Sequence, residues 1–130
     1  MAFAGSTGVQ RGDHFEFKAS AAETASTTHN VAHPGGPGMT SIVVKVTAAS
    51  GTTPTMTIVV EGSDDETNWF QLGVIGSGGY SVGTTATAPT NITTTGTSRA
   101  AFVTPEFIRT RSVIGGTTPS FTYSVEASIG

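Results

Sequence analysis

The sequence predicts an all-β protein, an antiparallel β-sandwich or jelly-roll-like single domain that follows a flexible N-terminal arm. Two observations support this fold class. Threonine, serine and glycine are abundant, and β-branched threonine favours strands whereas glycine and serine favour turns. Apolar residues also occupy every second position in several short segments, which is the pattern of a strand with one buried face. A chain of 130 residues fits one domain.

The N-terminal third begins with the arm, residues 1–12, "MAFAGSTGVQRG", which is rich in glycine and small residues. The β-sandwich domain is therefore expected to span residues 13–130. In "HFEFKAS", Phe15 and Phe17 share one face of a strand, and the intervening positions place Glu16 and Lys18 on the other. A weaker strand is expected within "ETASTTHNVA".

The central strands have the same two-residue period. "TSIVVKVTA" and "TPTMTIVVEG" each place three apolar side chains on one face: Ile42, Val44 and Val46, then Met56, Ile58 and Val60. "NWFQLGVIG" is the expected return strand of a hairpin, and "TSRAAFVT" predicts a further weak strand.

The C-terminal strands alternate most regularly. "EFIRTRSVIG" places Phe107, Arg109, Arg111 and Val113 on one face, and "PSFTYSVEASIG" places Phe121, Tyr123, Val125, Ala127 and Ile129 on one face. Turns are expected at "HPGGPG", "GTTP", "GSGG", "TAPTN" and "GGTTP", which gives seven or eight short strands.

Composition and charge argue against several functional classes. Only 12% of the residues are charged and the net charge is −3, which argues against a nucleic-acid binder. No apolar run is long enough to span a membrane, and the N-terminus lacks the features of a secretory signal. Cysteine is absent, so disulfides, thiolate metal ligands and a cysteine nucleophile are excluded. These features fit a protein assembled in a reducing cytosol.

An acidic cluster precedes the only tryptophan, Trp69, and consists of Glu61, Asp64, Asp65 and Glu66. Paired carboxylates can perform acid–base chemistry, and clustered oxygens can bind calcium. Residues within one turn do not face each other across a cleft, however, and the calcium-loop pattern is missing. The favoured interpretation is a hydrophilic turn in which Asp64 and Asn68 bond to nearby backbone.

Two other motifs were considered as catalytic or metal sites. "GYSVG" places Ser81 in a G-x-S-x-G pattern, but the following "TTATAPTN" does not predict the helix that a nucleophile elbow requires. His29 and His33 lie four residues apart, and with His14 they could form a three-histidine zinc site. Surface histidines are the favoured interpretation, and a site shared around an oligomer axis remains the alternative. No catalytic, cofactor or metal residue is predicted.

Of three further surface motifs, the pair Arg109 and Arg111 is more informative than the other two. "RGD", beginning at Arg11, is interpreted as an accident of the arm, and "NIT", beginning at Asn91, as a polar loop. Arg109 and Arg111 lie on one strand face. They form either a solvated face, on which the aliphatic parts of the arginine side chains cover apolar surface, or a docking patch for an acidic partner.

The segments "TIVVEGSDDETNWFQLG" and "EFIRTRSVIGGTTPSFTYSVEASIG" resemble small β-rich virion structural proteins of tailed bacteriophages, of the capsid decoration or cement type. Such proteins carry a strand ending in a "VEGS-DG-NW" type of turn and a closing "R-R-V…TPSFT-SV" pair. Here Asp65 and Glu66 replace the usual glycine-containing turn tip. The resemblance implies a structural role in the virion and supplies no catalytic residues.

The expected function is that of a non-enzymatic capsid decoration protein that stabilises a tailed-phage head. It would bind the major capsid protein on the capsid exterior, as a homotrimer, after assembly in the host cytoplasm. The expected contact residues are Phe3, Val9, Arg11, Phe15, Phe17, Arg109 and Arg111. The alternatives are a tail or head–tail connector subunit, and a carbohydrate-binding module whose stacking residues are Trp69, Phe70 and Tyr80.

Overall fold

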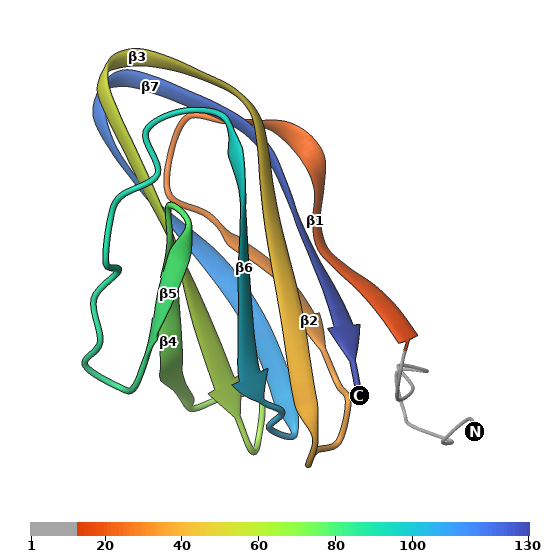
Figure 1. Cartoon of the computed structure of the whole chain (residues 1–130). Coiled ribbons are helices and arrows are strands. Elements are labelled where there is room, and N and C mark those ends of the chain that lie inside the picture. Colours follow the sequence, from red (N-terminus) through yellow and green to blue (C-terminus); the bar gives the residue numbers. More distant parts are fainter. Residues whose placement is uncertain (1–12) are drawn as a thin grey trace.

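The computed structural model describes residues 13–130 as seven β-strands in one antiparallel sheet, with no helix in that range (Figure 1). Accordingly, no helix in this part of the chain is long and apolar enough to cross a membrane. The strands are β1 (Asp13–Glu23), β2 (Thr28–Ala32), β3 (Met39–Ser63), β4 (Trp69–Gly76), β5 (Gly79–Val82), β6 (Gly96–Val103) and β7 (Phe107–Ile129). The all-β prediction is confirmed.

The sheet is built around β3 and β7, which are far longer than the other strands and pair with each other along most of their length. The first part of β3 and the last part of β7 are flanked by β6 and β1. We call these four segments the β6 half. The last part of β3 and the first part of β7 are flanked by β4 and β2, and β5 pairs with β4. These five segments form the β4 half.

The two long strands bend together at one end of the molecule, where Figure 1 shows them passing side by side. The bend lies at the two "GTTP" segments, which the sequence predicted as turns that end strands. Instead the strands continue through them, with register shifts in the pairing. Gly51 and Gly116 have φ angles of 111° and 109°, and a Cβ on either would meet a backbone oxygen of the other strand at 2.7 Å. Glycine is required at both corners.

The bend belongs to an internal repeat. "GTTPTMTIVVEG", from Gly51, matches "GTTPSFTYSVEA", from Gly116, in its first four residues and in the later Thr, Val and Glu positions. The two copies cross at equivalent residues, because Thr52 pairs with Thr117. The end of β3 is flanked by β4 just as the end of β7 is flanked by β1. The long strands are therefore related by an approximate internal twofold symmetry.

One core lies between the two halves, because the inward side chains of both belong to a single hydrophobic cluster. The alternation predicted for β3 and β7 is confirmed: Ile42, Val44, Val46, Met56, Ile58, Val60, Phe121, Tyr123, Val125, Ala127 and Ile129 are all buried. Lys18 departs from the prediction because it is buried rather than solvent-facing. The pairing of β1 with β7 shifts register between Glu16 and Lys18, which turns the lysine inward.

The shorter strands agree in part with the prediction. The expected hairpin return strand is β4, and the strand expected within "TSRAAFVT" is β6. The segment "ETASTTHNVA" is divided, since Glu23 ends β1 and β2 begins at Thr28. The strand β5 was not predicted. It contains Ser81, which pairs with Val74, and the chain that follows is not helical, so the nucleophile-elbow pattern has no elbow geometry.

Candidate interaction face

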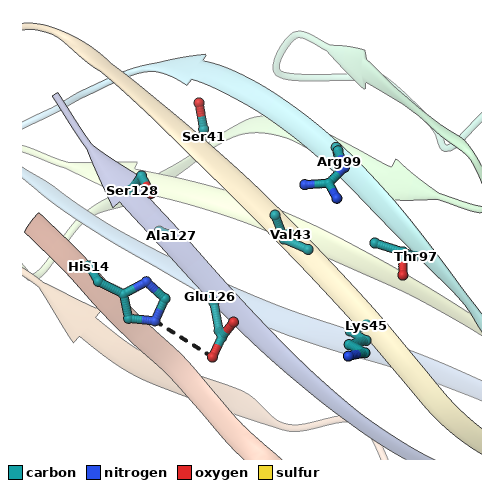
Figure 2. Close-up of a pocket in the computed structure, with 9 residues that line it drawn as sticks. All are labelled: His14, Ser41, Val43, Lys45, Thr97, Arg99, Glu126, Ala127 and Ser128. Carbon is teal, nitrogen blue, oxygen red and sulfur yellow. Dashed lines mark ion pairs between the residues drawn. The ribbon is translucent and has the colours of Figure 1, made fainter. Parts of the chain in front are cut away.

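The outer face of the β6 half carries side chains from four neighbouring strands. Residues that alternate with buried ones point away from the core, and directly paired residues share a face. The pairing of Glu16 with Glu126, of Glu126 with Val43, and of Val43 with Arg99 aligns these four residues in one row across the sheet. Figure 2 shows the last three of them around a depression in this face.

The depression has a volume of about 460 Å³ and is bounded by both charged and small side chains. Its lining consists of His14, Ser41, Val43, Lys45, Thr97, Arg99, Glu126, Ala127 and Ser128. A second depression of about 350 Å³ shares Ser41, Val43 and Arg99 with the first and reaches Tyr80. Arg99 therefore borders both, and the two adjoining hollows are together called the depression over β3 and β6.

Charges are distributed unevenly over this face. Within residues 13–130, neither Lys45 nor Arg99 forms an ion pair or a hydrogen bond with a described side chain. On the opposite side of the depression, Glu126 Oε1 lies 3.5 Å from His14 Nε2, and Glu16 lies directly across from Glu126. The face is thus cationic over β3 and β6 and acidic over β1 and β7.

The outer face of the β4 half differs because its two arginines, Arg109 and Arg111, both contact one carboxylate within the chain. Glu61 Oε1 lies 2.9 Å from Arg109 Nε, and Glu61 Oε2 lies 3.1 Å from Arg111 Nε. The guanidinium of Arg109 also stacks 4.0 Å from the centre of the Trp69 ring. The predicted docking patch at Arg109 and Arg111 thus already contains an acidic partner, and binding of an external one remains a prediction.

The other predicted contact residues lie near the start of the chain. Phe3, Val9 and Arg11, together with the start of the "RGD" motif, lie outside the described residues. Phe15 is half-buried and packs edge-to-face against Phe17, with 5.0 Å between ring centroids. Only 1% of Phe17 is exposed, so this side chain belongs to the core and is not accessible to a partner.

A buried polar cluster joins β1, β2 and β7, and sequence reasoning missed it. The Tyr123 hydroxyl donates a short hydrogen bond to Glu23 and lies 2.9 Å from His29 Nε2. Because the hydroxyl proton of Tyr123 is donated to Glu23, the Tyr123 oxygen accepts a hydrogen bond from His29 Nε2. His29 Nδ1 then carries no proton and accepts a hydrogen bond from Thr110 Oγ1 at 2.8 Å. The geometry therefore fits a neutral imidazole.

Burial sets the electrostatics of the cluster. It lowers the pKa of His29, an effect that Glu23 opposes and Lys18 reinforces. It also lowers the pKa of Lys18, whose Nζ donates to the main-chain oxygens of Ala19, Ala21 and Tyr123 at 3.0, 2.8 and 3.0 Å. Burial and the bond to Glu23 raise the pKa of the Tyr123 hydroxyl. These groups satisfy one another and form an internal polar contact between strands.

The histidines occupy three separate environments. His14 lies beside Glu126, whereas His33 stacks on Phe107 with 4.1 Å between ring centroids. The side chain of His29 is only 2% exposed, so the expectation of a surface histidine is wrong there. No three His, Asp or Glu residues in the described part of the chain are arranged to hold a metal ion. A three-histidine site within one chain is therefore excluded, and a site shared around an oligomer axis remains a prediction.

The acidic cluster is divided between a strand and a turn. Glu61 lies in β3, whereas Asp65 organises the turn by accepting hydrogen bonds from the backbone of Thr67 and Asn68 at 2.9 and 2.8 Å. These bonds lower the pKa of Asp65. The predicted turn is confirmed, but Asp65 and Ser63 rather than Asp64 accept its backbone bonds, and the Asn68 side chain donates to Asp65 Oδ2 instead of bonding to the backbone.

No protein-family model matches the chain, and no curated protein is significantly similar to it.

Proposed function

We propose that the chain is a structural protein of a tailed-phage virion that decorates the capsid exterior and binds the major capsid protein. The proposal combines the resemblance of two segments to such proteins with one structural observation. That observation is the outer face of the β6 half, where two adjoining hollows lie next to two cations, Lys45 and Arg99, that have no acidic partner in the described chain.

The fold proposed for this role is a β-sandwich of jelly-roll-like form. Two features support it: the long strands bend at Gly51 and Gly116, and side chains from both halves share one core. Such a fold leaves two outer faces available, one on each half. The β4 half uses its charged residues internally, at Glu61, Arg109 and Arg111, which favours the β6 half for docking.

The start of the domain connects this face with the predicted arm. The first described strand begins at Asp13, directly after residues 1–12, and His14 already lines the depression. An arm leaving this point can extend contacts that begin on the outer face. Many modest contacts of this kind would bridge neighbouring capsid subunits, and ordering of the arm would carry an entropic cost.

Co-sedimentation with capsids of the parent phage assembled without this protein tests the proposal. The full chain is expected to bind saturably. Deletion of residues 1–12 is expected to abolish binding while the domain stays folded, because the described strand pairing starts at Asp13. The proposal fails if the full chain does not bind, and the arm has no role if the deletion variant binds with full affinity.

The alternative functions make different predictions. Native mass spectrometry is expected to give a trimer for a decoration protein, whereas rings of six or more would favour a tail or head–tail connector subunit. For the carbohydrate-binding alternative, the ring of Trp69 is covered on one side by the guanidinium of Arg109. That leaves Phe70 and Tyr80, each 40% exposed, as the accessible aromatic side chains of the proposed set.

A further inference from the structure

We infer that the depression over β3 and β6 binds an extended acidic segment of a protein partner, with its carboxylates held between Lys45 and Arg99. The inference rests on the proposed function, since it names the chemistry of the partner surface that this face recognises. It starts from the described cations. Lys18 is buried, Arg109 and Arg111 pair with Glu61, and Lys45 and Arg99 remain available on one outer face.

The strand register places the two available cations close together along one track. Arg99 pairs with Val43, and Lys45 pairs with Thr97, so Arg99 and Lys45 are diagonal neighbours on the same face. Diagonal neighbours across two strands have Cα atoms about 7–8 Å apart, within reach of two long side chains that contact one ligand. Figure 2 shows both side chains in the lining of the depression, with Val43 beside them on β3.

The depression also sets the direction of the ligand. Both parts share Ser41, Val43 and Arg99, and they extend toward Tyr80 at one end and Lys45 at the other. A segment that follows this track passes Arg99 in its middle. The exposed ring of Tyr80 and the half-buried Val43 offer apolar contacts beside the two charges. A partner segment that combines acidic with apolar residues therefore complements the surface.

The acidic side of the face restricts where such a segment can lie. Glu126 and Glu16 occupy the neighbouring strands β7 and β1, and they repel a carboxylate that moves away from β3 and β6. His14, which lies 3.5 Å from Glu126, offsets that repulsion only when it is protonated. Because the contacts are exposed, the attraction is expected to weaken as salt concentration rises.

The first test uses the isotope-labelled full chain and a hexaglutamate peptide as probe, with hexalysine as the control. Hexaglutamate is expected to shift the side-chain NMR signals of Arg99 and Lys45, and to bind more tightly to Glu126→Gln because one repulsive carboxylate is removed. Hexalysine is expected to leave both signals in place. The inference is overturned if hexaglutamate moves neither signal.

The second test measures capsid affinity of a Lys45→Ala/Arg99→Ala variant at low salt. Its control, Thr84→Glu/Thr93→Glu, makes the same change in net charge at exposed positions outside the depression. Loss of two charge contacts is expected to weaken binding about tenfold in the first variant only. Equal affinity of the two variants overturns the inference and leaves the decoration function standing. If the wild-type chain does not bind capsids, the proposed function fails, and the peptide test still decides the chemistry of the depression.

Discussion

At the residue scale, the most informative feature is the contrast between two equivalent positions of the internal repeat. Ile58 of the first copy packs in the apolar core, and its counterpart Tyr123 packs there too but carries a hydroxyl that contacts Glu23 and His29. The repeat therefore keeps the shape of the strand while one copy accommodates a polar cluster. Every buried side-chain nitrogen and oxygen in the described residues has a hydrogen-bond partner. The cluster therefore avoids the large free-energy cost of burying unpaired polar groups.

Replacing Tyr123 by phenylalanine tests the value of that hydroxyl. The variant leaves Glu23 and His29 without their shared partner in a buried site, so we expect a loss of about 1–3 kcal/mol in the free energy of unfolding. Tyr80→Phe is the matched control, because Tyr80 is exposed and its hydroxyl does not contribute to the buried core. Urea denaturation measures both variants, and equal stabilities would contradict the account of the cluster.

The neutral state of His29 predicts a pH dependence of stability. Burial lowers its pKa in the folded protein below the ordinary value of 6.5, so the unfolded chain binds a proton more readily. Stability is therefore expected to fall as pH drops below about 6.5 and the unfolded state gains protons. Urea denaturation at pH 7.5 and 5.5 measures this loss, which should be smaller in His29→Gln. An identical pH dependence in both proteins would show that His29 is not responsible.

At the scale of elements, the corners of β3 and β7 determine the architecture. The backbone of each strand passes so close to the other that neither Gly51 nor Gly116 has room for a side chain. Both residues also adopt positive φ, which disfavours any other residue type. The close contact of two symmetric corners lets both strands bend at the same place and continue on the other side of the core.

Alanine substitutions separate the effect of close packing at the corners from the effect of a positive φ angle alone. Gly51→Ala and Gly116→Ala are expected to destabilise the protein by similar amounts, about 3 kcal/mol or more, since each adds a backbone clash to conformational strain. Gly78→Ala is the control, because Gly78 has a φ of 69° but open space around it, and we expect a loss of about 1 kcal/mol. Thermal or urea denaturation compares the three. Equal effects would argue against tight packing at the corners.

The strands were predictable from the sequence because their side-chain alternation is regular, as in the residues from Phe121 to Ile129. The corners were not predicted because glycine, threonine and proline have the same local signature in a turn as in a bent strand. Repetition of "GTTP" in two alternating segments was the signal that could have revealed them. The inward position of Lys18 depends on a register shift, and the cluster around His29 depends on contacts between distant strands. Neither is encoded in a local pattern.

The candidate face illustrates the same limit. Lys45 and Arg99 are far apart in the sequence, and only the pairing of β3 with β6 makes them neighbours. Arg109 and Arg111 were visible as a pair in the sequence, but the pairing of β3 with β7 brings Glu61 between them. Sequence reasoning therefore recognised the charges of the compensated face and missed those of the open one.

At the scale of the whole molecule, the two outer faces have different roles in our account. The β4 half pairs both of its arginines with Glu61, whereas the β6 half leaves a depression and two cations available beside the start of β1. We propose that the β6 half faces the capsid. Exposed side chains provide reporters of that orientation, namely Met39 on β3 and Tyr80 of β5, which lines the proposed depression, and on the opposite side Phe70 on β4.

Hydroxyl-radical footprinting of the full chain, free and bound to capsids, tests this claim most directly. Met39 is 50% exposed and Tyr80 is 40% exposed in the free protein, so both can be oxidised, as can Phe70 at 40%. Capsid binding is expected to protect Met39 and Tyr80 and to leave the oxidation of Phe70 unchanged. Protection of Phe70 without protection of Met39 and Tyr80 would place the β4 half against the capsid and contradict the account.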